Sequence, residues 1–88
     1  HSNNYVSAAY YVKAPENCGN FKALNPSIIN RNMFPKSIKG TELNSNMASI
    51  KVNEGDLLIF PAYLPHSVEK NNSDEDRVII SFNIDILK

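Results

Sequence analysis

The segment RVIISFNIDI, residues 77–86, alternates strictly between two sets of side chains. A period of two places successive side chains on opposite faces of a β-strand, so this segment predicts a strand with two different surfaces. No segment sustains a helical period, and turn residues separate several further runs rich in β-branched and aromatic residues. This pattern is typical of an all-β sandwich or barrel. We expect strands at residues 5–12, 20–24, 49–52, 57–60, 64–69 and 77–86, with one more short strand near Ile28–Ile29 inside a long loop over residues 26–47.

The last predicted strand has one wholly apolar face, formed by Val78, Ile80, Phe82, Ile84 and Ile86. Its other face carries Arg77, Ile79, Ser81, Asn83 and Asp85. An uncovered apolar sheet face is a surface for a partner or a site of aggregation. We therefore expect a homodimer or a higher homo-oligomer that buries the apolar face.

Composition limits the classes of function. At 88 residues the chain supports at most one domain, and its formal net charge of zero argues against a nucleic-acid or membrane-surface binder. The single cysteine, Cys18, excludes an intrachain disulfide and a four-thiolate zinc site. A lone cysteine and the absence of long apolar runs lead us to expect a cytoplasmic protein.

A histidine and an arginine lie close together in the C-terminal part of the sequence. Pro61 ends the apolar run at residues 57–60 before His66, and Arg77 begins the last strand. In an antiparallel hairpin, this spacing would place His66 and Arg77 at neighbouring positions of one sheet, facing the same interior. A neutral imidazole binds a divalent first-row metal, and a guanidinium matches the geometry of a carboxylate. This pair of groups is suited to a 2-oxo acid that chelates a metal.

Two stretches, GDLLIFPAYLPHSVEKNNSDEDRVIISFNI and HSNNYVSAAYYVKAPENCGN, resemble the signatures of the iron(II)/2-oxoglutarate oxygenases. The similarity is greatest to a small bacterial and phage subgroup and covers residues 1–25 and 50–85. It implies a double-stranded β-helix, the cupin-like jelly roll, with a mononuclear iron and 2-oxoglutarate as the cosubstrate. We accordingly expect one jelly-roll domain over residues 1–88, lacking the N-terminal helices and early strands of the family.

The resemblance also assigns roles to individual residues. His66 matches the distal histidine that binds Fe(II), and His1 falls in the proximal metal motif. Arg77 matches the arginine that pairs with the far carboxylate of 2-oxoglutarate. Tyr11 matches a strand tyrosine that contacts this cosubstrate, with Tyr10 as the alternative.

The sequence departs from the family pattern at the metal site. If His1 is the first histidine of the motif, Asn3 stands where a carboxylate is usual. If His1 is the second histidine of a His-x-His variant, the first one precedes the chain. Ile79 replaces a small hydroxyl residue that often assists the arginine. A complete iron site within this chain is therefore an open question.

Simpler roles exist for the same residues. The alternative for His66 is an ordinary hairpin histidine, and the alternative for Arg77 is a surface ion pair with Asp74, Glu75 or Asp76. Cys18 is expected to be an inert thiol. Three functions remain: a 2-oxoglutarate-dependent hydroxylase of unknown substrate, a non-catalytic cupin-like module with an incomplete metal site, and a cupin isomerase or sugar-binding domain. Binding of metal and of 2-oxoglutarate distinguishes them.

Overall fold

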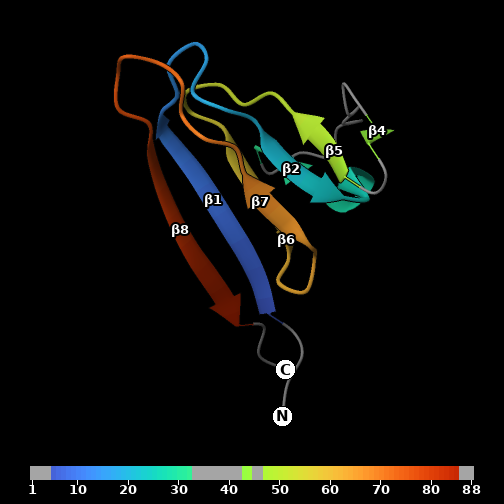
Figure 1. Ribbon diagram of the computed structural model, residues 1–88. Helices are drawn as coiled ribbons and strands as arrows, with labels where there is room; N and C mark the ends of the chain where they lie inside the picture. The colour runs from blue at the N-terminus through green and yellow to red at the C-terminus, as the bar shows by residue number, and fades with distance from the viewer. Residues whose placement is uncertain (1–4, 33–42, 45–46, 86–88) are drawn as a thin grey trace.

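The computed structural model describes residues 5–32, 43–44 and 47–85. Two four-stranded antiparallel sheets face each other, with strand orders β3-β6-β1-β8 and β4-β5-β2-β7 (Figure 1). The prediction of an all-β, cupin-like jelly roll is confirmed as a partial jelly roll. The described residues contain no helix of the length and hydropathy that a transmembrane segment requires. The strands are β1 (Tyr5–Lys13), β2 (Phe21–Leu24), β3 (Asn30–Arg31), β4 (Leu43–Asn44), β5 (Met47–Ile50), β6 (Leu57–Pro61), β7 (His66–Val68) and β8 (Val78–Asp85).

The core lies between the two sheets and is built from the inward faces of alternating strands. Strand β1 pairs with β6 on one side and with β8 on the other, so Ala9 lies between Leu58 and Ser81. Leu58 is fully buried, because the alternation along β6 turns its side chain toward the core. The largest fully buried side chains are Tyr11, Phe21, Ile29, Ile50 and Leu58.

The apolar face of β8 points away from this core, as the alternation predicts. Val78, Ile80, Phe82 and Ile84 are between 41% and 52% exposed, whereas Ile79 packs against the core. Ile86 lies outside the described residues. Burial of this face by a second copy of the chain stays a prediction.

The structure corrects the sequence prediction between β2 and β6. The short strand expected near Ile28–Ile29 begins two residues later, at Asn30, because Pro26–Ile28 form a short 3-10 helix preceded by Asn25 in the left-handed conformation. Proline at the first helical position has a fixed φ that suits such a turn. The extended backbone follows at β3, which pairs with β6, and β5 begins two residues before the predicted strand at 49–52.

Two connections join the sheets at the same end of the sandwich. The turn between β1 and β2 contains Cys18 and Gly19, and the loop between β7 and β8 begins at Glu69. The backbone N–H groups of Glu69 and Asn72 donate to the carbonyls of Asn20 and Asn17, at 2.9 and 3.0 Å. These hydrogen bonds hold the two connections side by side.

Candidate metal and cosubstrate site

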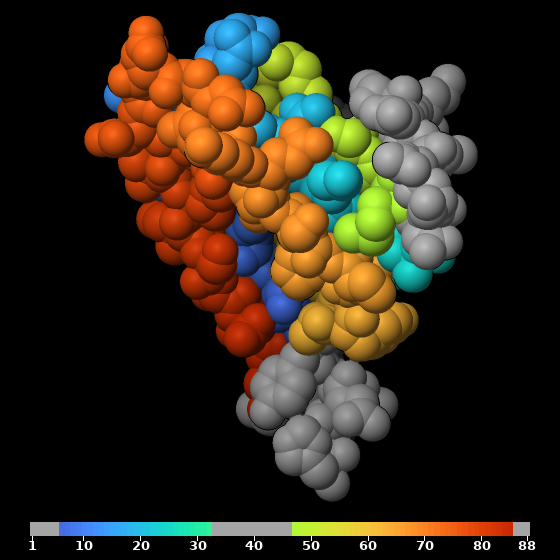
Figure 2. Space-filling model, in the orientation of Figure 1, coloured from blue at the N-terminus to red at the C-terminus, as the bar shows by residue number. Residues whose placement is uncertain are grey.

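A cavity of about 290 Å³ lies between the two sheets. Strands β7 and β8 are the edge strands of their sheets, and in Figure 2 β1 is visible in the groove between them. The cavity therefore opens to solvent on the side where neither edge strand is paired among the described residues. It is lined by Ser7, Ala8, Ala9, Phe21, Phe60, His66, Val68, Ile79, Ser81, Phe82 and Asn83.

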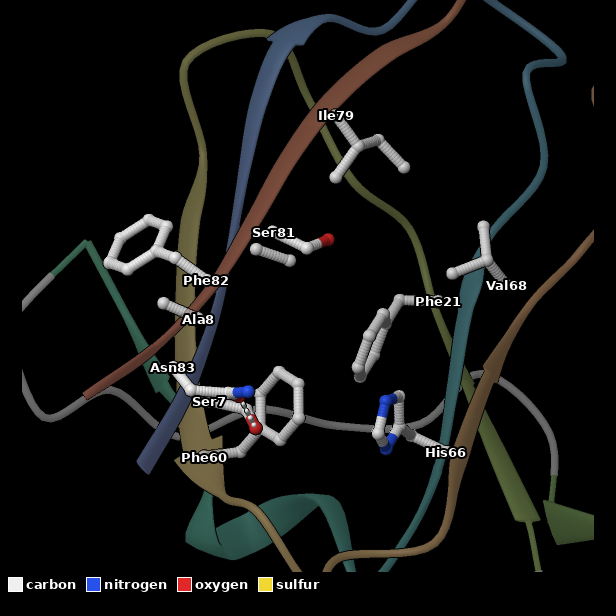
Figure 3. A pocket seen from close by; sticks show the side chains of 11 residues that line it. Ser7, Ala8, Phe21, Phe60, His66, Val68, Ile79, Ser81, Phe82 and Asn83 are labelled. Carbon is white, nitrogen blue, oxygen red and sulfur yellow. Dashed lines mark hydrogen bonds between the residues drawn. The ribbon is translucent and has the colours of Figure 1, made fainter. Parts of the chain in front are cut away.

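His66 begins β7 and presents its ring to this cavity (Figure 3). The ring lies nearly parallel to Phe21, with centroids 5.6 Å apart, and 4.8 Å from the ring of Phe60. Its Nδ1 atom is 2.7 Å from the carbonyl oxygen of Leu64, which can only accept a hydrogen bond, so Nδ1 carries the proton. Nε2 then keeps its lone pair. A backbone carbonyl that fixes the tautomer in this way is the usual support of a metal-binding histidine.

Arg77 precedes β8 and joins the two connections described above. Its Nη1 donates to the carbonyl oxygens of Cys18 and Glu69, both at 2.5 Å. None of the ion pairs among the described residues involves Arg77, whereas Glu75 pairs with Lys13 at 3.6 Å. The surface ion pair considered for Arg77 is therefore not formed. Because a guanidinium carries five N–H donors, Nη2 and Nε remain for a carboxylate.

Tyr11 lies inside the core, and Tyr10 lies on the outer face of the same strand with 39% of its surface exposed. The Tyr11 hydroxyl is buried and has no hydrogen-bond partner among the described residues. Burial raises the pKa of Tyr11 from 10.0 to about 12, and the positive charge of Arg77 opposes this rise. Tyr11 therefore has a protonated hydroxyl whose pKa responds to the charge of Arg77, and of the two tyrosines it alone faces inward. Neither Tyr11 nor Arg77 is among the residues that line the cavity.

The predicted placement of His66 and Arg77 in one sheet is wrong. Strand β7 pairs with β2, whereas β8 pairs with β1 in the other sheet. The loop between them crosses from one sheet to the other instead of turning back as a hairpin. Arg77 contacts the carbonyl of Glu69, which lies three residues beyond His66, about 10 Å along the backbone at about 3.3 Å per residue.

The proximal part of the predicted metal site cannot be placed. His1 and Asn3 lie outside the described residues. Among the residues that the structure does describe, no three His, Cys, Asp or Glu side chains are grouped as metal ligands. His66 is the ligand-type side chain that lines the cavity.

The burial of Tyr11 predicts a loss of stability at high pH. Its pKa is higher in the folded state than in the unfolded state, so its contribution is complete below pH 10.0 and is lost as the pH rises toward about 12. The loss amounts to at most about 3 kcal/mol, from two pKa units. Urea unfolding between neutral pH and pH 12 would measure it.

Two variants isolate this effect from the titration of lysines. Tyr11→Phe should lack this part of the pH dependence and should be at least as stable as the native chain at neutral pH, because it removes an unpaired hydroxyl. Tyr63→Phe, at a position 78% exposed, should behave as the native protein. Equal pH profiles for Tyr11→Phe and the native chain would contradict the prediction.

Several groups of the site were not singled out from the sequence. Phe21 and Phe60 contact the ring of His66, and the carbonyls of Cys18 and Glu69 accept hydrogen bonds from Arg77. Because every residue has a backbone carbonyl, the sequence could not show which carbonyls contact Arg77. The alternation of β8 was a usable signal that Ile79, Ser81 and Asn83 share one face of the strand, and the structure places all three in the cavity lining.

Comparisons with known proteins agree with this architecture. The sequence profile of the family described as "Putative 2OG-Fe(II) oxygenase" matches residues 1–83. No curated protein and no solved structure matches the chain significantly. Since the profile covers nearly all of the chain, the protein belongs to this 2OG-Fe(II) oxygenase family.

Proposed function

We propose that this chain is part of an iron(II)- and 2-oxoglutarate-dependent dioxygenase that hydroxylates an organic substrate. In this proposal His66 and His1 are the two histidine ligands of the iron. Arg77 and Tyr11 bind the carboxylate of 2-oxoglutarate that lies away from the metal. Two observations carry the proposal: the buried hydroxyl of Tyr11 has no hydrogen-bond partner, and the Arg77 guanidinium has no acidic partner among the described residues.

The local chemistry of each residue fits its role. The hydrogen bond from Nδ1 of His66 to Leu64 leaves Nε2 for a metal. A carboxylate beside Arg77 would accept hydrogen bonds from the guanidinium and from the Tyr11 hydroxyl, and would remove the cost of leaving that hydroxyl unpaired.

The separation of His66 and Arg77 suits a five-carbon dicarboxylate. Four C–C bonds of about 1.5 Å give an extended span of about 5 Å. Two metal–ligand bonds of about 2 Å each, from His66 to the metal and from the metal to the cosubstrate, and a hydrogen bond of about 3 Å extend this reach to about 12 Å. This is comparable to the distance along the backbone from His66 to the Glu69 carbonyl that Arg77 contacts, so one molecule of 2-oxoglutarate could join both groups.

Bound iron would supply the activation of O₂, which the protein side chains cannot perform. The protein residues contribute the other functions. Phe21 and Phe60 hold the imidazole of His66 in a fixed orientation. Arg77 and Tyr11 orient the cosubstrate, and the side chains of Val68 and Ile79 contribute apolar surface to the cavity.

The experiment is anaerobic addition of iron(II) and 2-oxoglutarate, followed by visible absorption spectroscopy. We expect the weak charge-transfer band that enzymes of this family give when the cosubstrate chelates the metal. His66→Ala should abolish the band, with a loss of iron affinity greater than the roughly 100-fold that removal of a supporting hydrogen-bond partner costs.

Two matched tyrosine variants test the binding of 2-oxoglutarate. Tyr11→Phe should keep iron binding but weaken 2-oxoglutarate about tenfold, from one lost hydrogen bond to a charged group. Tyr63→Phe should have no effect. A folded native chain without the band would favour the non-catalytic cupin-like module, and iron binding unaffected by 2-oxoglutarate would favour the cupin isomerase or sugar-binding domain.

A further inference from the structure

The cavity contains a strip of polar side chains that the proposed iron and cosubstrate sites do not use. Ser7 of β1 pairs with Asn83 of β8 in register, and Ala9 pairs with Ser81 in the same way. Cross-strand partners share a face of the sheet, so Ser7, Ser81 and Asn83 all face the cavity. The small side chain of Ala9 leaves room beside the Ser81 hydroxyl.

The strip has hydrogen-bonding capacity to spare. Ser7 Oγ donates to Asn83 Oδ1 at 2.9 Å, which orients the amide and leaves its Nδ2 group free to donate. No hydrogen bond among the described residues uses Asn83 Nδ2 or the Ser81 hydroxyl. Figure 3 shows the Ser81 hydroxyl directed into the cavity, with the rings of Phe21 and His66 across from it.

The cosubstrate does not reach this strip. Asn83 lies six residues beyond Arg77 along an extended strand, about 20 Å at about 3.3 Å per residue. The reach of 2-oxoglutarate plus its contacts is about half of that, and it ends near His66. The end of the cavity at Ser7 and Asn83 is thus available to a second ligand next to the metal position.

The lining indicates the chemistry of that ligand. Apart from the imidazole of His66, no titratable side chain lines the cavity among the described residues. A charged group placed there would keep part of its hydration, because the cavity opens to solvent, but it would gain no opposite charge from the lining. An amide or hydroxyl group would instead find a donor in Asn83 and a donor and acceptor in Ser81, and an apolar body would contact Phe21 and Phe60.

We propose that Ser81 and Asn83 determine substrate specificity by binding an uncharged amide or hydroxyl group of a substrate whose apolar part packs against Phe21 and Phe60. The proposal rests on the proposed function only in calling this ligand a substrate. The binding site itself requires neither iron nor 2-oxoglutarate. Ser7 is a positioning residue, because it acts by holding the Asn83 amide.

The test uses benzamide, benzoate and benzamidinium, three probes of nearly equal shape with charges of zero, −1 and +1. Each is titrated into the full, metal-free chain, and the amide resonances of Ser81 and Asn83 are followed by NMR. We expect benzamide to shift both resonances with a dissociation constant about tenfold below those of the charged probes. Benzoate should instead shift Cys18 and Glu69, next to Arg77.

One variant that introduces a negative charge makes the test specific. Asn83→Asp should favour benzamidinium over benzamide by about tenfold, because it supplies the missing negative charge. Asn30→Asp carries the same change on the exposed strand β3, outside the cavity lining, and should keep the native order. Ser81→Ala should weaken benzamide binding about threefold, from one lost neutral hydrogen bond.

The outcomes separate this proposal from the proposed function. Equal or tighter binding of a charged probe at Ser81 and Asn83, or no shift with any probe, would overturn it even if the iron–2-oxoglutarate band forms. Preference for benzamide with reversal in Asn83→Asp would support it even if the band does not form. In that second case only the oxygenase assignment would fail.

Discussion

Arg77→Met is expected to lower the free energy of unfolding by about 3 kcal/mol and to abolish 2-oxoglutarate binding. The first effect arises because the carbonyls of Cys18 and Glu69 lose their shared donor, and an unpaired, partly buried acceptor costs about 1–3 kcal/mol. The second effect arises because methionine lacks the positive charge and the N–H donors with which a guanidinium binds a carboxylate. Urea unfolding without cosubstrate measures the first, and the iron–2-oxoglutarate band measures the second.

Arg77→Lys separates the two roles. An ammonium group can still donate to both carbonyls, so most of the stability should remain, but it lacks the fork that binds a carboxylate through two hydrogen bonds. We expect 2-oxoglutarate to bind about tenfold more weakly than to the native chain. Native-like stability of Arg77→Met would contradict the carbonyl contacts, and native-like cosubstrate binding would contradict the proposed role.

Gly19→Ala should lower the free energy of unfolding by about 4 kcal/mol, because it combines left-handed backbone strain with overpacking. Gly19 has a φ of 96°, and a Cβ atom there would lie 2.5 Å from the carbonyl oxygen of Glu69 and 2.6 Å from that of Lys70. Both obstacles are backbone atoms, so a rotamer change cannot relieve the contact. The variant should unfold at lower urea concentration and should also lose 2-oxoglutarate, because Glu69 holds Arg77.

Gly55→Ala is the matched control. Gly55 also has a positive φ, 88°, but a Cβ atom there would meet nothing within 4 Å. Only the backbone strain applies, so we expect a cost of about 1 kcal/mol and unchanged cosubstrate binding. Equal losses of unfolding free energy in the two glycine variants would show that the close approach of the β1–β2 turn to the Glu69 carbonyl leaves enough room for a Cβ atom.

Much of the fold follows from alternation in the two longest strands. The sequence places Tyr11 opposite in direction to Tyr10, and Ile79 opposite to Ile80, and both assignments are confirmed. These positions are predictable because a half-buried strand needs one apolar or small face toward the core. The turn at Gly55 is confirmed for the same local reason, a residue free to adopt positive φ.

The connections were less predictable, because their geometry depends on partners distant in sequence. Nothing local to residues 69–77 distinguishes a hairpin from a loop that crosses between sheets, so the relation of His66 to Arg77 was predicted incorrectly. Strand β3 is only two residues long and exists through its pairing with β6. The proximal histidine, His1, lies outside the described residues and remains a prediction.

The position of the Arg77 guanidinium has a consequence for how ligand occupancy can be observed. One nitrogen bridges the connection that leads from the first sheet to the second and the connection that leads back. A dianion bound by the remaining nitrogens of Arg77 would therefore stabilise the packing of both sheets through this one side chain. Thermal denaturation should register such a ligand through the whole molecule, with a midpoint that rises with the logarithm of its free concentration.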